Sequence, residues 1–178
     1  MLENLKESLE SVGDRLVRQV KRNLVAKGKN VSGVLEDSIS VEVIEEDDGK
    51  LVLEYTMVEY GYYQDEGVKG ANPKKIKKGR QKAPYSRFQF GSGKGRGSLS
   101  KGLDKWIVQK GIAPRDKQGR FLSRATLKFL MSRSIYNQGI EPSMFFTDAW
   151  DKMIKEIEPE LQEALEKDFR KQFIELIR

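Results

Sequence analysis

The chain has 178 residues and contains neither histidine nor cysteine. The missing histidines remove the commonest general base and metal ligand, and the missing cysteines remove disulfides and thiolate metal sites. No apolar run approaches the roughly 20 residues that a membrane-spanning helix needs. The amphipathic start, Met1–Glu7, carries mixed charge and is not expected to be a signal peptide. We therefore expect no enzyme, no cofactor and no membrane protein, with a carboxylate-only Mg²⁺ site as the remaining catalytic alternative.

What is present describes a polar chain that is long enough to bury a core. Hydrophobic residues make up 38% of the chain and charged residues 34%. A chain of this length is expected to form one domain, here 1–178. The absence of cysteine fits a reducing compartment or a virion.

A long helix is predicted from Leu2 to Ala26, because leucine and valine recur there on one helical face. Gly28 is a suitable residue to end it. The apolar face has two interpretations, packing on a sheet or forming a helix–helix seam between subunits. Packing on a sheet is the favoured one.

A β-hairpin is predicted next. Apolar and polar residues alternate over 39–43 and again over 51–57, and Asp47–Lys50 between them contains an Asp-Gly turn signal. Two strands alone form a marginal sheet, so a further strand is expected. It would come from Val58–Tyr63, from Met144–Phe146 or from a neighbouring subunit.

Three more helices are predicted towards the end of the chain, at about 98–110, at about 123–137 and from Thr147 or Asp148 onward. Pro159 lies within the last of them, so a kink or a broken pair of helices is expected there. The side chains expected to face inward are Leu99, Leu103, Trp106 and Ile107, then Leu127, Leu130, Met131 and Ile135, and finally Trp150, Met153, Ile157, Leu161, Leu165 and Phe169.

This order of elements predicts an α+β fold. An antiparallel β-hairpin would be packed by long N- and C-terminal helices. The core would comprise about 1–67 and 139–178. A long basic arm at about 68–98 and two inserted helices at about 98–138 would separate its two parts.

The basic arm is the strongest compositional feature. Residues 69–105 contain twelve lysines and arginines against one acidic residue, Asp104, so they carry +11 and the other 141 residues carry −5. Tyr85, Phe88 and Phe90 are interleaved with these charges, a combination that suits nucleic acid. Contact with the acidic face of a neighbouring copy is an equally weighted alternative. The candidate contact residues are Lys74, Lys75, Lys77, Lys78, Arg80, Lys82, Arg87, Lys94 and Arg96.

Other candidate sites are weaker. The glycine-rich segment 91–97 lacks the spacing of a phosphate-binding loop and is interpreted as a flexible loop. Asp47 and Asp48 are interpreted as a solvated hairpin tip in preference to a cation site. Nothing in the sequence brings Glu59 together with the acidic pair Asp65–Glu66.

Three blocks resemble one protein family, the tail-component (tail-completion, head–tail joining) proteins of tailed bacteriophages. Val31–Val43 resembles that family's Thr-Gly-x-Leu-x-x-Ser-Ile block, Tyr60–Gly67 its Tyr-Ala-x-Tyr-x-x-Phe-Gly block, and Glu141–Ala149 its Pro-x-Pro-Phe-x-x-Pro-Ala block. Glu66 stands where the family has an aromatic residue and Ser143 where it often has proline. The residues that carry the resemblance are Gly33, Leu35, Ser38, Ile39, Tyr60, Tyr63, Gly67, Phe145, Phe146 and Ala149.

The resemblance implies a structural virion protein without catalysis. It would form a hexameric or dodecameric ring at the neck or upper tail, after assembly in the host cytoplasm. Its partners would be further copies of itself, neighbouring connector, neck or tail proteins, and passing DNA. Tyr60 and Tyr63 are expected to pack against the sheet and helices, as core or subunit-contact aromatics.

Overall fold

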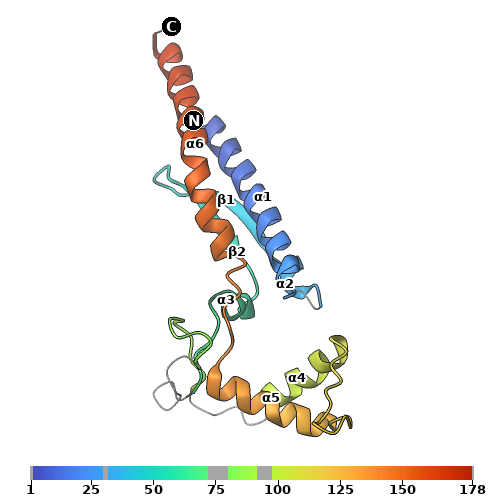
Figure 1. Cartoon of the computed structure of the whole chain (residues 1–178). Helices are drawn as coiled ribbons and strands as arrows, with labels where there is room; N and C mark the ends of the chain where they lie inside the picture. Colours follow the sequence, from blue (N-terminus) through green and yellow to red (C-terminus); the bar gives the residue numbers. More distant parts are fainter. Residues whose placement is uncertain (1, 30–31, 72–79, 92–97, 178) are drawn as a thin grey trace. The chain divides into compact units, whose positions relative to one another are not determined.

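The structure is a computed structural model that describes residues 2–29, 32–71, 80–91 and 98–177 (Figure 1). The chain divides into two compact units. Unit 1 combines the two ends of the chain, Met1–Val58 and Met144–Arg178, and unit 2 is the intervening segment Glu59–Ser143. Unit 1 contains a two-stranded antiparallel sheet packed against the long N- and C-terminal helices, so the predicted α+β fold is confirmed.

Helix α1, Glu3–Ala26, forms as predicted. It buries Val12, Leu16, Val20 and Leu24, the residues of its predicted apolar face. This face packs on the sheet and on the C-terminal helix, which is the favoured interpretation of its pattern. The helix ends just before Gly28, as expected.

The predicted hairpin consists of strands β1, Ser40–Glu45, and β2, Leu51–Thr56. The two strands pair in antiparallel register, from Ser40 opposite Thr56 to Glu45 opposite Leu51. The short helix α2, Val34–Ser38, precedes β1. The hairpin turn has Gly49 at a φ of +81°, a conformation that glycine adopts without steric cost.

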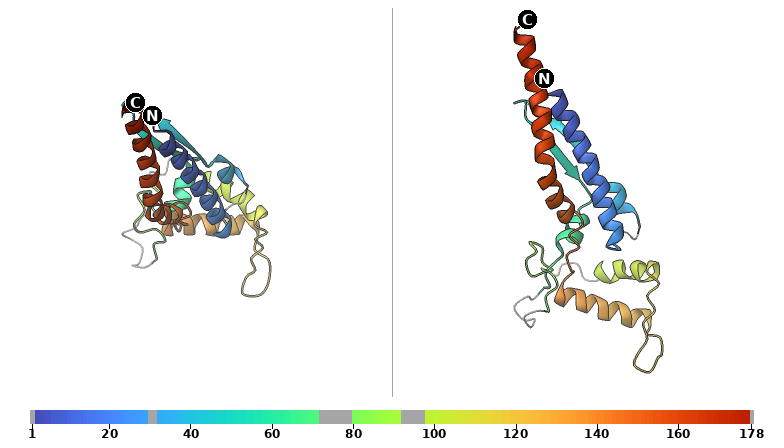
Figure 2. Two further views of the ribbon diagram at one scale, coloured as in Figure 1. Left: turned by 90° about the horizontal axis from the view of Figure 1, so that it is seen from above. Right: turned by 45° about the horizontal axis from the view of Figure 1, so that its top comes forward.

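Helix α6, Thr147–Ile177, lies beside α1 in every view (Figure 2). It continues through Pro159, so the predicted broken pair of helices is wrong. Pro159 faces solvent, and α6 has half-buried or buried residues both before it, at Met153 and Ile157, and after it, at Ala164. Packing on both sides of the proline offsets the backbone hydrogen bond that its ring removes.

The core of unit 1 is formed by α1, α2, β2 and the start of α6. Phe145 is fully buried at its centre. Tyr55 of β2 meets the rings of Phe146 and Trp150 edge-on, with centroids 5.7 Å and 5.9 Å apart. The buried members of this cluster are Leu16, Val20, Leu24, Leu35, Ile39, Phe145 and Ala149.

The described residues contain no third strand in the sheet. The segment predicted as a strand at Val58–Tyr63 instead enters helix α3, Tyr60–Glu66, in which the Tyr63 hydroxyl donates to Glu59 one turn earlier. Met144–Phe146 is a turn, with Met144 at a φ of +53°, because Phe145 there inserts into the core. Both intrachain alternatives for the third strand are therefore wrong, and the neighbouring subunit stays a prediction.

Unit 2 contains α3 and the helices α4, Ser98–Gln109, and α5, Arg124–Gln138. Ser123 caps α5, and its Oγ accepts a hydrogen bond from the backbone amide of Thr126 at 3.1 Å. Leu103 and Ile107 of α4 are buried, whereas α5 buries no residue. Leu130 is exposed, so its predicted inward orientation is wrong.

The described part of the basic arm, predicted at about 68–98, is anchored by backbone pairing. Val68 pairs with Ile140, and Lys69 pairs with Gln89. The Gln81 side chain accepts a hydrogen bond from the Gly70 amide and donates one to the Asn137 carbonyl. These contacts fasten two parts of the arm to each other, to the last turn of α5 and to Ile140 beyond it.

Candidate interaction surfaces

The two units carry opposite charge. Unit 1 has 21 acidic and 14 basic side chains, a net charge of −7. Unit 2 has 6 acidic and 19 basic side chains, a net charge of +13. The predicted basic arm is therefore part of a larger basic region that continues through α4 and α5. A surface of this kind attracts a polyanion or an acidic protein face.

Three of the nine candidate arm residues lie in the described part of the chain: Arg80, Lys82 and Arg87. Arg80 and Lys82 are exposed. Arg87 pairs with Glu66 at 2.7 Å, and its guanidinium lies 4.8 Å from the ring centroid of Phe88. The other six, Lys74, Lys75, Lys77, Lys78, Lys94 and Arg96, lie outside the described residues, as does most of 91–97.

The three aromatic residues interleaved with the arm differ in their surroundings. Tyr85 is 97% exposed. Phe88 packs edge-on against Tyr63, with the ring centroids 4.6 Å apart, and Phe90 is half-buried. Of these three, Tyr85 is the ring most available for stacking on an external partner.

The first family-like block connects α2 to the hairpin. Gly33 occupies the N-cap position of α2, and Leu35 and Ile39 are buried in the core. The Ser38 hydroxyl donates to the Leu35 carbonyl at 2.8 Å and accepts from the Val58 amide at 3.1 Å. This serine therefore fastens the residues beyond β2 to the end of α2.

The second family-like block forms α3 and its end. Tyr60 is exposed and is not a core residue, whereas Tyr63 packs on Phe88. The hydrogen bond from the Tyr63 hydroxyl to Glu59 raises the pKa of that tyrosine. Gly67 is buried at a φ of +71°, and its carbonyl accepts a hydrogen bond from Ser86 Oγ at 2.7 Å.

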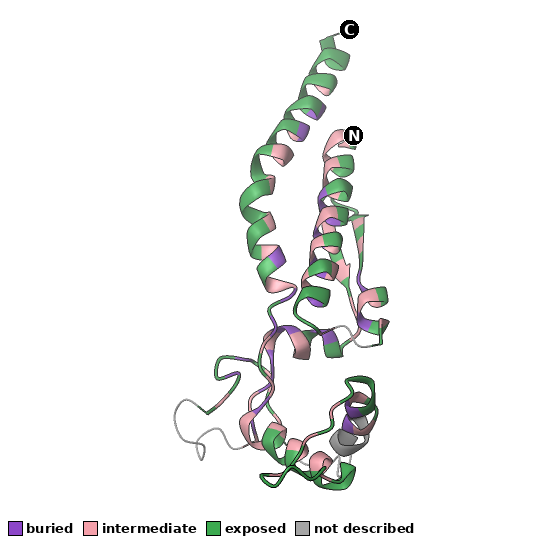
Figure 3. Ribbon diagram, turned by 45° about the vertical axis from the view of Figure 1, so that its right-hand side comes forward, coloured by how far each residue is buried: buried purple, intermediate pink, exposed green. Residues whose placement is uncertain are grey.

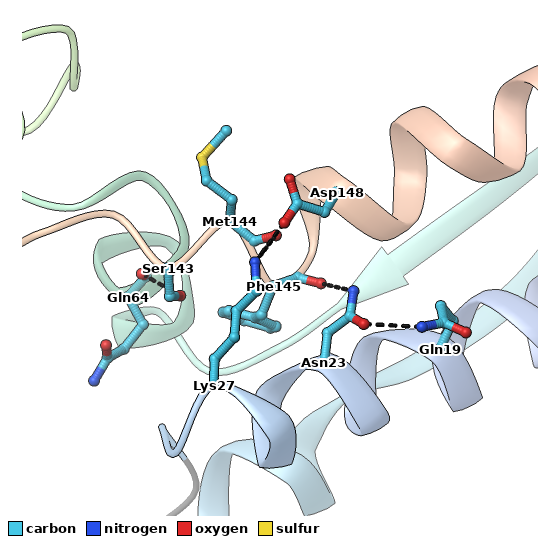
Figure 4. A network of polar contacts seen from close by, with 8 residues as sticks. All are labelled: Gln19, Asn23, Lys27, Gln64, Ser143, Met144, Phe145 and Asp148. Atoms are coloured by element: carbon cyan, nitrogen blue, oxygen red, sulfur yellow. Dashed lines mark hydrogen bonds and ion pairs between the residues drawn. The ribbon is translucent and has the colours of Figure 1, made fainter.

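The third family-like block opens α6 and is held by α1. The Asn23 side chain donates to the Phe145 carbonyl at 3.0 Å, and Lys27 reaches both the Met144 carbonyl and the Asp148 carboxylate (Figure 4). Phe146 packs against the core and Ala149 is part of it. Polar groups at the end of α1 thus fix the turn that inserts Phe145.

The two positions that differ from the resembled pattern, Glu66 and Ser143, make polar contacts. Glu66 forms the ion pair with Arg87. Ser143 donates from its backbone amide and its hydroxyl to the Gln64 carbonyl, at 3.0 Å and 2.6 Å (Figure 4). A proline at position 143 could make neither hydrogen bond.

The C-terminal end of α6 is an exposed apolar surface, which we call the α6 tip: Phe169, Phe173, Ile174, Leu176 and Ile177. Figure 3 shows the last turns of the helix largely in the colour of exposed residues. The predicted inward orientation of Phe169 is therefore wrong. Lys171 pairs with Glu3, the first residue of α1, at 2.7 Å. Because α1 begins at Glu3, the residues of α6 beyond Lys171 extend past it (Figure 1).

A second exposed apolar surface lies between α4 and α5. It is a groove of about 350 Å³, which we call the α4–α5 groove. Val108 and Phe121 are exposed in its wall, and the Arg115 guanidinium lies 3.7 Å from the Phe121 ring centroid. The groove is lined by Ile107, Val108, Gly111, Ile112, Ala113, Pro114, Phe121, Leu122, Arg124 and Leu127.

Neither surface was singled out from the sequence. The α6 tip had a signal, because four of the five residues from Phe173 to Ile177 are apolar, which is more than one helical face requires. The sequence signal for the groove was weaker, because its lining residues are spread over two helices and the connection between them.

The acidic residues of the described ranges do not gather at a metal site. No group of three or more acidic residues there is placed to hold a metal ion. Asp48 accepts a hydrogen bond from the Lys50 amide at the hairpin tip, and Glu46 pairs with Lys50. Likewise, no helix in the described ranges is long and apolar enough to cross a membrane.

Comparisons of the chain with protein-family models, with curated proteins and with solved structures found no match.

Proposed function

We propose that this chain is a structural virion protein of a tailed bacteriophage that assembles into a ring at the head–tail joint. The observation that carries the proposal is the ordered set of three family-like blocks. The first and third of them contribute Leu35, Ile39, Phe145 and Ala149 to one core, although about half of the chain separates them. The proposed role needs no catalysis and no cofactor.

The opposite charges of the two units supply a mechanism for self-assembly. Unit 1 of one copy, with a net charge of −7, attracts unit 2 of another copy, with a net charge of +13. Contacts between two different surfaces of identical chains are heterologous, and they close into a ring when the rotation between copies allows it. The open edges of the two-stranded sheet offer a further place for a neighbouring copy.

The proposal is tested by measuring the mass of the purified protein in solution and by searching for the chain in purified particles. We expect a ring or a stable association with the particle. A strictly monomeric protein that never enters particles would contradict the proposal. Imaging of the assembly would distinguish a hexamer from a dodecamer.

Nucleic-acid binding is a second candidate function, favoured by Tyr85. The Tyr85 ring is almost completely exposed and lies three residues after the exposed Lys82. It belongs to unit 2, which has a net charge of +13. Binding to DNA would weaken steeply with added salt, because phosphate contacts release counterions. Deletion of 69–97 would abolish it. If the deletion abolishes assembly and leaves DNA affinity unchanged, the arm instead contacts other subunits.

A further inference from the structure

We propose that the α6 tip of one copy docks into the α4–α5 groove of a second copy. The inference rests on the proposed self-assembly and names the surfaces that carry it. Both surfaces belong to this chain, so one kind of molecule supplies both halves of the contact.

The α6 tip has the composition of a docking element. Phe173 is 65% exposed, and Leu176 and Ile177 beyond it are also exposed. Aromatic and aliphatic side chains that project from the end of a rigid helix are typical anchors of protein interfaces. A contiguous apolar surface of this kind marks an interaction site in a soluble chain.

The α4–α5 groove has the matching shape and chemistry. Its volume of about 350 Å³ is enough for apolar side chains and lies at the small end of ligand-sized pockets, which span roughly 300–1,000 Å³. Val108 is 57% exposed in its wall. Insertion of an amphipathic helix into an apolar groove is a recurrent mode of protein recognition.

Charge selects a second copy as the occupant. Helix α6 carries nine acidic and five basic side chains. Glu156 and Glu158 are exposed along it, whereas Glu163 and Glu166 form ion pairs with Lys167 and Arg170 of the same helix. Arg124 lines the groove and is exposed, and Lys105 and Arg133 are exposed on the same pair of helices. An acidic helix with an apolar end therefore meets a basic surface with an apolar groove. Pairing of two α6 tips with each other would leave the groove and its basic surroundings uncovered.

The test uses one substitution in each surface of the full chain. Phe173→Gln removes an apolar anchor while keeping a residue of good helix propensity. Val108→Lys places a charge in the groove near the C-terminal end of α4, where a cation is favourable for the helix. Phe129→Gln is the matched control, because Phe129 is 62% exposed on α5 and does not line the groove. We expect the first two variants to be monomeric in light scattering and the control to assemble like the wild type.

Mixing the variants identifies the geometry of the contact. The Val108→Lys copy keeps an intact tip and the Phe173→Gln copy keeps an intact groove, so the mixture should form dimers that do not grow further. Assembly of Val108→Lys alone would point to pairing between tips and overturn the proposal. Wild-type-like assembly of both variants would overturn it too, and would leave the proposed virion function standing if the chain still enters particles. A wild-type chain that stays monomeric and outside particles would overturn both.

Cross-linking gives a readout that does not depend on loss of assembly. Because the chain has no cysteine, Phe173→Cys and Val108→Cys each introduce a single thiol. A disulfide requires Cα atoms within about 7 Å. Oxidation of the mixed variants should yield a covalent dimer that contains one of each. Dimers formed equally well by Phe173→Cys mixed with Phe129→Cys would contradict a specific contact.

Discussion

The carboxylate of Asp168 accepts hydrogen bonds from the backbone amide and the side-chain amide of Asn4, 164 positions earlier in the chain, at 3.1 Å and 2.7 Å. It also accepts one from the Leu5 amide at 2.9 Å. These amides belong to the first turn of α1, whose own N-cap residue, Leu2, provides no side-chain cap. A residue of the last helix therefore caps the first helix, and this joins the two ends of the chain within unit 1.

Replacement of Asp168 by alanine should lower the free energy of unfolding by about 1–3 kcal/mol, because it removes the cap and leaves α1 amides without their acceptor. Asp168 is only 1% exposed, so water does not readily replace the lost oxygen atoms. Asp151→Ala, at an exposed position of the same helix, is the matched control and should change stability much less. Urea denaturation of the three proteins measures the difference, and equal losses for both variants would contradict the capping role.

The same contact predicts that the stability contributed by Asp168 depends on pH. Burial raises the pKa of Asp168, but the hydrogen bonds from Asn4 and Leu5, together with nearby Lys171, lower it by more, so the pKa lies below its ordinary value. A depressed pKa in the folded state gives stability that is present above the unfolded value, about 3.9, and is lost as the pH falls through the folded value. The stability advantage of the wild type over Asp168→Asn should therefore shrink below about pH 4. A difference in stability between the two proteins that stays constant from pH 7 to pH 3 would contradict this prediction.

At Gly13, α1 approaches the sheet closely. A Cβ atom at this position would lie 2.9 Å from Val41 Cγ2 and 3.2 Å from Leu53 Cδ1. Gly13→Leu should therefore destabilise the protein by about 1–3 kcal/mol through overpacking, despite the better helix propensity of leucine. Ser11→Leu, on the exposed face of the same helix, is the control. Equal thermal midpoints for the two variants would mean that the sheet moves away without cost.

Much of the fold follows from periodicity in the sequence. The bounds of α1, α4 and α5 and the two strands agree with the predictions to within a few residues, because each has its own apolar pattern and end signals. Two of the errors have a common cause. Phe169 and Leu130 have the helical spacing of core residues, but the described residues of their units leave both exposed. Periodicity gives the face on which a residue lies, and burial depends on what packs against that face.

The candidate surfaces were less predictable than the fold. The basic charge of the arm can be counted from the sequence, and the structure extends it to the whole of unit 2. The cap from Asp168 to Asn4 and the α4–α5 groove depend on tertiary contacts between distant segments. Such contacts have no signature in the local sequence, so a single sequence does not predict them.

The hydroxyl group of Tyr55 should be removable without loss of stability. It is buried and has no hydrogen-bond partner among the described residues, and burial, with a contribution from Asp14, raises its pKa to about 12. Tyr55→Phe removes this hydroxyl and keeps the ring contacts with Phe146 and Trp150, so stability should be unchanged or higher by up to about 1 kcal/mol. Tyr55→Ala is the contrasting variant and should lose about 3–5 kcal/mol. A clear loss of stability in Tyr55→Phe would indicate that the hydroxyl has a bound partner.

Gly67, in the second family-like block, ends α3 with a positive φ in a place that leaves no room for a side chain. A Cβ atom there would lie 2.5 Å from the Ile140 carbonyl oxygen and 2.7 Å from the Pro142 nitrogen, both backbone atoms. Gly119 has a similar φ, +79°, with nothing within 4 Å of its Cβ position, so it isolates the cost of backbone strain. Gly119→Ala should cost about 1 kcal/mol, and Gly67→Ala should cost more, because the chain around Ile140 must move. Hydrogen exchange of the Val68 and Ile140 amides, each of which donates to the carbonyl of the other residue, reports on this region directly. Equal exchange in the two variants would show that the close backbone contact at Gly67 adds nothing to local stability.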